Sequence, residues 1–207
     1  MMRIGVYGGS FDPIHFGHLL VAEQCREQAR LDKVIFVPVA NSPLKDSGPV
    51  ANDRQRIEMI SLAIAGHSSF EISTMEIDRG NKSYTVETLT VLKEEQPDDD
   101  FFLIIGQDSL HTFDRWKEPK TICKLAVPLV VARPESGNSK PVDLDRLKPF
   151  ASESCYEEIK SVAITSRLID ISSTEIRRRI SDGNSIRFLT SRAVEKYIET
   201  AKLYRVN

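Results

Sequence analysis

The chain has 207 residues, of which 41% are hydrophobic and 28% are charged, and its formal net charge is -2 at pH 7. This composition suits one globular α/β domain, and a chain of this length buries enough surface to fold without disulfides or structural metal ions. A near-neutral balance of charge provides no global positive field that would attract nucleic acid, so no nucleic-acid partner is expected.

The sequence also carries no pattern that indicates a membrane span, a signal peptide or a disulfide framework. No apolar stretch approaches the length of about 18 residues that a membrane span needs, and the first residues, MMRIGVY, are typical of a strand and not of a signal peptide. The three cysteines, Cys25, Cys123 and Cys155, are odd in number and form no C-x-x-C pair. They indicate neither a zinc knuckle nor a disulfide framework, so we expect reduced thiols in a cytoplasmic protein with no membrane partner.

The first half of the chain alternates strands and helices. An apolar run over residues 3–7 predicts a buried strand, a helix is predicted over 18–30, and a second strand over 34–37. Strand, helix and strand in this order form a βαβ unit, whose right-handed crossover implies parallel strands. Further helices are predicted over 52–65, which opens with an Asn-x-x-Gln capping box, and over 84–96, which ends before a proline.

The second half continues this alternation. Strands are predicted over residues 101–105 and 129–132, and a late strand is expected within 162–171. The segment 135–149, which is rich in Ser, Gly, Asn and Pro, is expected to be the most mobile loop. Two helices complete the chain, over residues 173–181 and 191–202.

Alternating strands and helices predict an α/β, Rossmann-like fold, a doubly wound parallel sheet with a C-terminal helical segment at about residues 172–207. The whole chain, 1–207, is expected to form a single domain. In such sheets, ligands bind at the carboxyl ends of the strands near the point where the strand order reverses. The segments that follow strands are therefore candidates for the binding site, namely 8–18, 38–45, 106–116 and 171–178.

The turn after the first strand carries the strongest functional pattern, GGSFDPIHFGH at residues 8–18. The two glycines at its start are expected to let the backbone turn sharply and approach a ligand closely. The helix that begins near Gly17 offers unpaired N–H groups and the positive end of its dipole, which suit a phosphate group. His15 and His18 are three residues apart, so both imidazoles can face one side of the first turn and donate to a transferring phosphate.

Two other phosphate-binding signatures are missing, because the chain has neither the Walker pattern G-x-x-x-x-G-K-[ST] nor the dinucleotide fingerprint G-x-G-x-x-G. An alternative interpretation is that the histidines only cap the helix and the glycines only turn the chain. We favour the functional interpretation, because the whole pattern falls between the strand and the helix of one βαβ unit.

The GGSFDPIHFGH segment resembles the nucleotidyltransferase superfamily that carries an H-x-G-H signature and is distantly related to class I aminoacyl-tRNA synthetases. Within it, the chain most resembles the bacterial nicotinate-nucleotide adenylyltransferase family of NAD synthesis. The resemblance covers nearly the whole chain. Its further blocks are SYTVETL at 83–89, IGQD at 105–108 with Trp116, ISSTEIR at 171–177, RFL at 187–189, VEKYI at 194–198 and LY at 203–204.

The resemblance implies that the AMP part of ATP moves onto nicotinate mononucleotide, with Mg²⁺ accompanying ATP and no protein ligand to the metal. The catalytic residues implied are His15, His18 and Arg177. The residues implied to bind ATP are Gly8, Gly9, Ser10, Phe11, His15, His18, Gly106, Asp108, Ser173 and Arg177. The residues implied to bind the mononucleotide are Lys45, Thr85, Trp116 and Lys117.

The ISSTEIR block opens a predicted helix. Ser172 and Glu175 have the spacing of a capping box, and the positive end of the helix dipole suits an anion. Three arginines follow, but successive helical residues point about 100° apart, so the three cannot reach one pocket. The resemblance selects Arg177 for the triphosphate, and we expect Arg178 and Arg179 to lie on a solvated face.

Asp108 follows a buried strand and Gly106, a position where a carboxylate can accept hydrogen bonds from ribose hydroxyls. Its alternative role is an N-cap for a short helix around Ser109. Trp116, the only tryptophan, can stack on a pyridine ring or belong to the core. Its position on a loop after a strand, together with the resemblance, favours stacking.

The acceptor residues have simpler roles. Thr85, at the start of a predicted helix, offers a hydroxyl and an N–H group, and Lys45 offers a cation for the acceptor phosphate. The segment 116–118 is where the resemblance places the nicotinate carboxylate, bound by backbone N–H groups at a short helix that starts near Glu118. Lys117 adds a cation there unless its side chain faces water.

Two positions depart from the family pattern. Family members usually carry Pro-Pro-His-Lys after the second strand, whereas this chain has SPLK at residues 42–45, with Leu44 in place of the histidine. Before the last helix, the family often has Val-Pro where this chain has Thr190 and Ser191. We interpret that second departure as a change in helix capping only.

The expected reaction is a direct displacement, in which the 5′-phosphate of the acceptor attacks the α-phosphorus of ATP and pyrophosphate leaves. The attacking oxygen is already anionic, so alignment and charge stabilisation would supply the catalysis. Alternatives are the same chemistry on nicotinamide mononucleotide or phosphopantetheine, a fragment that charges transfer RNA, and a non-catalytic nucleotide sensor. ATP and nicotinate mononucleotide are the expected partners, and homo-oligomer formation is left open.

Overall fold

The structure, a computed structural model of the chain, describes residues 1–40, 48–80, 82–131, 142–162, 164 and 170–205. Two predictions fall partly or wholly outside these ranges: the roles of Lys45 and Leu44, and most of the late strand expected within 162–171. Ile164, which lies in that segment, forms a single parallel bridge with Val131. No helix in the described ranges is both long and apolar enough to span a bilayer.

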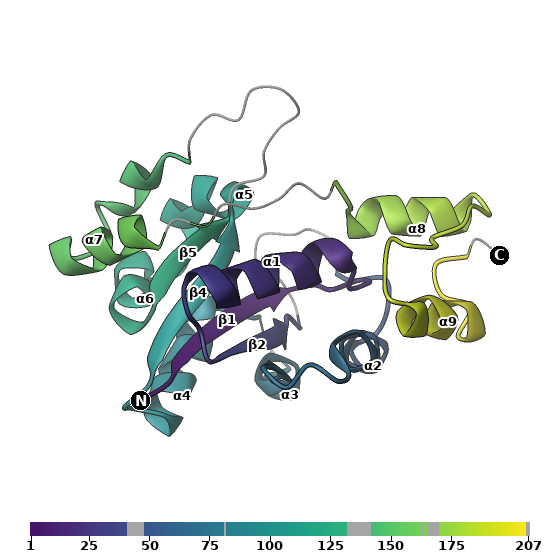
Figure 1. Ribbon diagram of the computed structural model, residues 1–207, viewed down its shortest axis with the longest axis horizontal. Helices are drawn as coiled ribbons and strands as arrows, with labels where there is room; N and C mark the ends of the chain where they lie inside the picture. Colours follow the sequence, from purple (N-terminus) through teal and green to yellow (C-terminus); the bar gives the residue numbers. More distant parts are fainter. Residues whose placement is uncertain (41–47, 81, 132–141, 163, 165–169, 206–207) are drawn as a thin grey trace.

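In the described ranges, five parallel strands form the central sheet, in the order β3-β2-β1-β4-β5 (Figure 1). Their bounds are Arg3–Gly9 for β1, Lys33–Pro38 for β2, Phe70–Ile72 for β3, Asp100–Gly106 for β4 and Val127–Val131 for β5. The predicted α/β, Rossmann-like sheet is therefore confirmed. β3 was not predicted, because a strand of three residues is too short to show an alternating pattern.

The five longer predicted helices are all present, with ends that differ from the predictions by a few residues. They are α1 at Phe16–Gln28, α2 at Asp53–Ile64, α4 at Thr85–Glu95, α8 at Ser173–Ser181 and α9 at Arg192–Thr200. The predicted caps are present at two of them. Asn52 and Gln55 form a reciprocal capping box at α2, and Ser172 accepts from the N–H of Glu175 at α8.

Four further α-helices are present in the described part of the chain. α5 (Gln107–His111) and α6 (Pro119–Leu125) lie where short helices were expected. α3 (Met75–Arg79) and α7 (Glu153–Ser161) were not predicted. Within the segment expected to be a mobile loop, 135–149, residues 135–141 lie outside the described ranges, and a short 3-10 helix at Leu144–Leu147 follows them.

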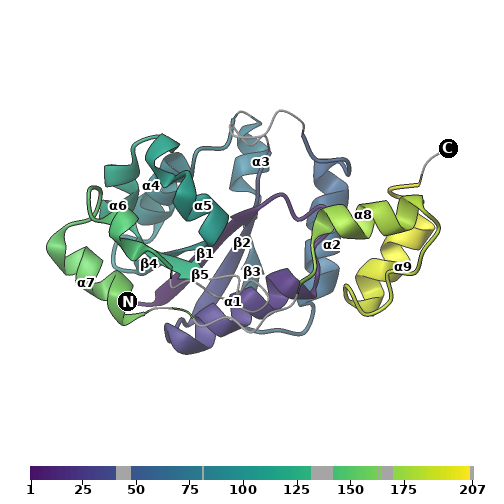
Figure 2. The same ribbon diagram turned by 90° about the horizontal axis from the view of Figure 1, so that it is seen from above.

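Different helices cover the two faces of the sheet. One face packs against α1 and α2, with Met59 in a core that also contains Ile176 of α8 and Val194 of α9. The other face packs against α4 and α6, with Leu89 and Ile122 in the second core. Both views show α8 and α9 together at one end of the molecule, opposite α7 (Figures 1 and 2). The C-terminal helices thus share a core with the first βαβ unit.

The three cysteines are free thiols, as predicted. Burial raises the pKa of Cys25 and of Cys123 to about 12, so both thiols stay protonated near neutral pH. A buried, protonated thiol is a poor nucleophile and a poor metal ligand, so these side chains serve the core.

Candidate active site

The candidate site lies at the carboxyl ends of β1 and β4, where the order of the strands reverses. β1 pairs with β2 on one side and with β4 on the other. The motif at residues 8–18 continues from β1, while Gly106 and Asp108 come at the end of β4. The two segments predicted to bind ATP therefore leave neighbouring strands, at the position where doubly wound sheets bind ligands.

The glycines of the motif act differently from the prediction. Gly8 and Gly9 are the last residues of β1, and the left-handed backbone conformation falls on Phe11, with a φ of 47°. A Cβ atom on Gly9 would lie 2.9 Å from the ring of Phe11, whereas one on Gly8 would meet no atom within 4 Å. Gly9 is thus needed for the packing of Phe11, and the space beside Gly8 is open.

The ring of Phe11 lies beneath the loop. This residue is 1% exposed, and its ring contacts Tyr7 edge-on at 5.5 Å and His18 at 5.0 Å between centroids. The Phe11 ring therefore packs against the imidazole of His18. If Phe11 contacts ATP as predicted, its backbone must make that contact.

His15 and His18 lie side by side, as their spacing predicted, and the structure shows in addition that their rings stack on each other. The ring centroids are 3.7 Å apart and the rings are inclined by 26°. The backbone N–H of His15 donates to Nδ1 of His18 over 3.3 Å. Because Nδ1 accepts this hydrogen bond, the proton of the neutral His18 ring is on Nε2, which makes that nitrogen a donor.

Gly17 makes this stack possible. A Cβ atom at Gly17 would lie 3.0 Å from both Cε1 and Nδ1 of His15, so a larger residue would push the ring aside. His15 is also the N-cap residue of α1, and the N–H of His18 donates to its carbonyl at 2.9 Å. The capping alternative is therefore present in the structure. Capping orients the His18 ring through Nδ1 and does not compete with phosphate binding through Nε2.

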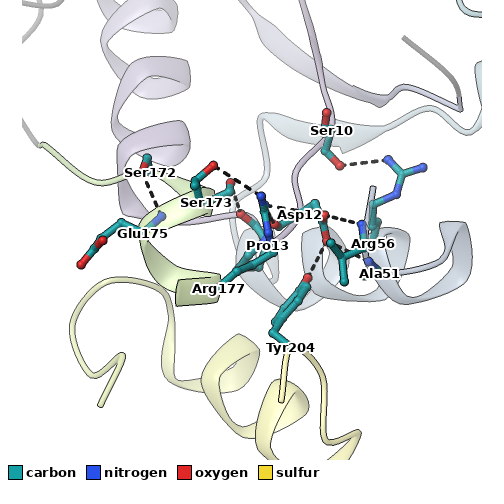
Figure 3. Close-up of polar contacts among 12 residues, drawn as sticks. Ser10, Asp12, Pro13, Ala51, Arg56, Ser172, Ser173, Glu175, Arg177 and Tyr204 are labelled. Atoms are coloured by element: carbon teal, nitrogen blue, oxygen red, sulfur yellow. Dashed lines mark hydrogen bonds and ion pairs between the residues drawn. The ribbon is translucent and has the colours of Figure 1, made fainter. Parts of the chain in front are cut away.

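Asp12 is the buried centre of the loop, and sequence reasoning did not single it out. It is 3% exposed, and its carboxylate accepts from the N–H of Val50 at 2.7 Å, the N–H of Ala51 at 3.1 Å and the hydroxyl of Tyr204 at 2.7 Å (Figure 3). Arg177 adds an ion pair at 3.7 Å. Burial, and next the charge of Asp12, raise the pKa of Tyr204 far above its usual value, so its hydroxyl remains a donor.

Arg56 of α2 is a second buried residue that the sequence did not indicate. Its side chain is fully buried, and Nη1 donates to the carbonyl of Ser10 at 2.9 Å (Figure 3). Its other terminal nitrogen pairs with Asp53 at 2.5 Å. The carbonyl of Ser10, a predicted ATP-binding residue, is thus held by α2.

Three side chains of the C-terminal segment each donate to one of three consecutive carbonyl groups of the motif. The pairs are Arg177 with Asp12 at 2.7 Å, Ser173 with Pro13 at 2.9 Å and Thr190 with Ile14 at 2.8 Å. In Figure 3, Ser173 and Arg177 of α8 point toward Asp12 and Pro13 of the motif. The backbone that precedes the two histidines is therefore held by residues more than 150 positions later in the chain.

Of the three consecutive arginines on α8, Arg177 is the one that contacts the motif. Arg178 is exposed and pairs with Glu175 and Asp182 at 2.8 Å each. Arg179 donates to the carbonyl of Ser185 at 2.8 Å. Arg178 and Arg179 are thus engaged outside the motif, as expected, and the grip of Arg177 on the triphosphate stays a prediction.

The position of Asp108 bears on the interpretation of this residue as the N-cap of a short helix. Gly106 is the N-cap of α5, and Asp108 lies one residue inside the first turn with an exposed side chain. The capping alternative is therefore wrong, because the cap position belongs to Gly106. Its carboxylate is exposed, and the contact with the ribose stays a prediction.

The predicted acceptor residues within the described ranges lie around the start of α4. Thr85 is the first residue of that helix. Just before it, Ser83 accepts a hydrogen bond from the N–H of Ala40 at 3.0 Å. This contact holds the start of α4 against the segment that follows β2, the segment in which Lys45 lies.

Lys117 is already paired in the structure. Its ammonium donates to Glu87 at 2.7 Å and lies 4.6 Å from the centre of the Tyr84 ring. This hydrogen bond to the Glu87 carboxylate raises the pKa of Lys117. Glu87 also pairs with Arg79 at 3.0 Å. To bind the acceptor as predicted, Lys117 has to leave Glu87 or share it.

Trp116 ends the 3-10 helix at Phe113–Arg115 and is partly buried. Its ring lies 5.2 Å from that of Phe113, inclined by 38°, and its Nε1 is buried without a hydrogen-bond partner among the described residues. The residue thus belongs partly to the second core. Stacking of its exposed part on a pyridine ring stays a prediction.

The described residues form no evident metal site. Among the described residues, no group of three or more His, Cys, Asp or Glu side chains is placed to hold a metal ion.

The sheet, the reversal of strand order and the histidine pair together define a class of proteins. The cytidylyltransferase-like family matches residues 6–179, a range that spans the motif and reaches into α8. The chain thus belongs to the cytidylyltransferase-like family.

Curated relatives narrow this class. A protein of Rhodopirellula baltica named "probable nicotinate-nucleotide adenylyltransferase" is 43% identical over 98% of this chain and 94% of its own length. A protein of the same name from Geobacter sp. is 40% identical and covers 98% of each chain. The chain belongs to the nicotinate-nucleotide adenylyltransferase family, as its sequence motifs predicted.

Solved structures share the fold. The nicotinic acid mononucleotide adenylyltransferase of Plasmodium falciparum, complexed with APC, has a TM-score of 0.74 at 20% identity and covers 99% of this chain and 98% of its own. The same enzyme complexed with NaAD has a TM-score of 0.73 at 21% identity. At this identity the likeness concerns the fold.

Proposed function

We propose that this chain transfers the AMP part of ATP to nicotinate mononucleotide, which yields nicotinate adenine dinucleotide and pyrophosphate. The observation that carries the proposal is the stacked pair His15 and His18 at the start of α1, beside the carboxyl ends of β1 and β4. The names of the relatives supply the substrates. Because α8 and the segments on either side of α9 hold the motif, we propose that the whole chain acts as one nucleotidyltransferase domain.

The reaction is a direct displacement at phosphorus. An oxygen of the acceptor 5′-phosphate forms a bond to the α-phosphorus of ATP, and the bond from that phosphorus to the bridging β-oxygen breaks, so pyrophosphate leaves with the electron pair. The attacking oxygen is already anionic, so no general base is needed. Catalysis then depends on alignment and on stabilisation of negative charge at the α-phosphate.

His18 is the proposed donor to the developing charge. Its Nδ1 is occupied by the N–H of His15, which fixes Nε2–H as the donor toward the α-phosphate. His15, stacked on His18 and only 4% exposed, contributes to holding the triphosphate. The N-terminus of α1, a helix of 13 residues, adds the positive end of its dipole.

Mg²⁺ is the ion that we propose accompanies ATP. The carboxylate of Asp12 is already occupied by three donors, and Asp108 is a single exposed carboxylate. This donor set fits a magnesium ion that is held mainly by substrate phosphate oxygens and water, since Mg²⁺ keeps several of its waters. The ion would supply neutralisation of phosphate charge.

We propose that the acceptor lies between the start of α4 and Trp116. The pyridine ring would stack on the exposed part of Trp116, and Thr85 would bind through its hydroxyl and N–H. Since Glu87 already neutralises Lys117, backbone N–H groups beside Trp116 are better placed than this ammonium to bind the nicotinate carboxylate.

The test of the proposed function is pyrophosphate release with a panel of acceptors. With nicotinate mononucleotide, we expect a kcat/KM about 10²-fold above that with nicotinamide mononucleotide, because the amide leaves buried donors mispaired. Equal values for acid and amide would remove the nicotinate assignment and leave adenylyl transfer standing. Activity only with phosphopantetheine would assign a different acceptor, and ATP binding without pyrophosphate release from any acceptor would indicate a sensor.

The role of Arg177 gives a second prediction. Arg177→Ala should weaken ATP binding by roughly 10-fold to 100-fold, because a guanidinium makes charge-assisted hydrogen bonds to phosphate, and should change nicotinate mononucleotide binding much less. Calorimetry with each substrate alone measures both affinities. Arg178→Ala, on the same helix but exposed and paired with Glu175 and Asp182, is the matched control. If Arg177→Ala binds ATP with unchanged affinity, Arg177 does not bind the triphosphate, and its contact with Asp12 serves the structure of the motif.

A further inference from the structure

A single peptide group connects Thr190 to the His18 imidazole. The hydroxyl of Thr190 donates to the carbonyl of Ile14 over 2.8 Å. The N–H at the other end of that same peptide unit belongs to His15, and it donates to Nδ1 of His18 over 3.3 Å. The hydroxyl, the peptide group and the imidazole therefore form one continuous chain of hydrogen bonds, in which each bond polarises the next.

The next peptide group is held by the same part of the C-terminal segment. The N–H of Phe16 donates to the carbonyl of Leu189 over 3.1 Å. Residues 189 and 190 thus bind the peptide groups on both sides of His15. A peptide group held at two points cannot tilt freely, so these contacts set the direction of the N–H that reaches His18.

Because the contact between Thr190 and the carbonyl of Ile14 is buried, water cannot replace it. Thr190 is 2% exposed, Ile14 is fully buried and His15 is 4% exposed. A buried carbonyl that loses its donor must remain unsatisfied or move until it finds another. Movement of this carbonyl also moves the N–H at the other end of the same rigid peptide plane.

Ser191, the residue after Thr190, makes a different contact. Ser191 is the N-cap of α9, and its hydroxyl accepts from the N–H of Val194 at 3.3 Å. The expectation that Thr190 and Ser191 together form a capping change is therefore correct for Ser191 and wrong for Thr190. The hydroxyl of Thr190 points to the motif, 176 residues earlier in the chain.

We infer that Thr190 is a positioning residue for His18. It sets the tilt of the Ile14–His15 peptide, and that peptide holds the imidazole with Nε2–H directed to the phosphate. Thr190 itself touches neither substrate. The inference rests on the proposed adenylyl transfer, because His18 is the donor in that reaction.

The test compares Thr190→Val with Thr190→Ser. Valine keeps the shape of the side chain and removes the donor, so we expect kcat to fall roughly tenfold, with less than about a twofold change in KM for ATP, because a misdirected donor costs more in the transition state than in the ground state. Serine keeps the hydroxyl and should restore kcat to within about threefold of the wild type. Ser191→Ala, which removes the cap of α9 but no contact to the motif, is the matched control for general loosening of the C-terminal segment.

Nuclear magnetic resonance of the histidine rings provides a readout that does not depend on activity. The chain has four histidines, so the imidazole nitrogen signals can be assigned by single substitutions. In the wild type and Thr190→Ser, Nδ1 of His18 should show the shift of an acceptor nitrogen and Nε2 that of a protonated one. In Thr190→Val, the two nitrogens should move toward averaged values, while the signals of His67 and His111 stay in place.

The outcomes separate the inference from the proposed function. A wild type that releases no pyrophosphate would defeat the proposed function, and the ring signals would still show whether Thr190 orients His18. Unchanged His18 signals and unchanged kcat in Thr190→Val would overturn the inference. An equal loss of kcat in Ser191→Ala and Thr190→Val would also overturn it, because the loss would then come from a loosened segment.

Discussion

Replacement of His18 by alanine should lower kcat roughly 10²-fold to 10³-fold and change KM for ATP by less than about threefold. In the proposed reaction, the donor Nε2–H acts on charge that grows at the α-phosphate, so its removal affects the transition state more than the bound substrate. The other groups proposed to bind the triphosphate, namely Arg177, His15 and the start of α1, remain in this variant. Initial rates of pyrophosphate release at saturating substrates, with KM from the same titration, measure both quantities.

His67→Ala is the matched control for this experiment. His67 pairs with Glu23 at 3.2 Å and stacks on Phe70, so it is a histidine with partners of its own outside the motif. We expect this variant to keep the wild-type kcat. Because the His18 ring also accepts from the helix start, its loss costs about 1 kcal/mol of stability, and both variants should be assayed well below their melting temperatures. Undiminished kcat in His18→Ala would remove this residue from the mechanism.

Asp12→Ala should destabilise the protein by about 3–5 kcal/mol, the range seen when one partner of a buried charged network is removed. The substitution leaves the N–H groups of Val50 and Ala51 and the hydroxyl of Tyr204 without their acceptor, and it removes the ion pair of Arg177. For a chain of this size, such a loss lowers Tm on the order of 10 °C. Thermal denaturation, together with urea titration of the same samples, measures the change.

Tyr204→Phe separates one of these contacts from the rest. It removes only the hydroxyl that donates to Asp12 and keeps the aromatic ring, so we expect a loss of about 1 kcal/mol. The two variants should therefore differ several-fold in their effect on the free energy of unfolding. An Asp12→Ala variant no less stable than Tyr204→Phe would show that the carboxylate is not the centre that joins the motif to α2 and the chain end.

Secondary structure followed from the sequence where the local signals were strong. The capping box of Asn52 and Gln55 formed as their spacing predicted, whereas only half of the box predicted for Ser172 and Glu175 is present, because the Glu175 side chain pairs with Arg178. The start of α1 was placed two residues late, because histidine is an unusual N-cap and the prediction began the helix at His18. The strand β3 and the helix α3 were missed, since runs of three and five residues carry too little periodicity.

The role of glycine in the motif shows why a correct pattern can be explained wrongly. Sequence reasoning attributed Gly8 and Gly9 to a sharp turn and to close approach of a ligand, and said nothing of the packing of side chains against glycine. In the structure, Gly9 is required by the ring of Phe11, and Gly17 by the ring of His15. Both reasons depend on where a neighbouring side chain points, which the order of residues alone does not specify.

The sequence by itself determined the fold class, the place of the motif between the first strand and the first helix, and the position of His15 and His18 on one side of the start of that helix. These features follow from periodicity, caps and spacing, which are local properties of the chain. Only the tertiary structure decided what holds the motif in place. Asp12 is bound by residues 38 and 192 positions away, and Ile14 by one 176 positions away. Such a hydrogen bond has no local signature, because its two groups meet only after the whole chain has folded, and it matters because burial leaves no water to replace it.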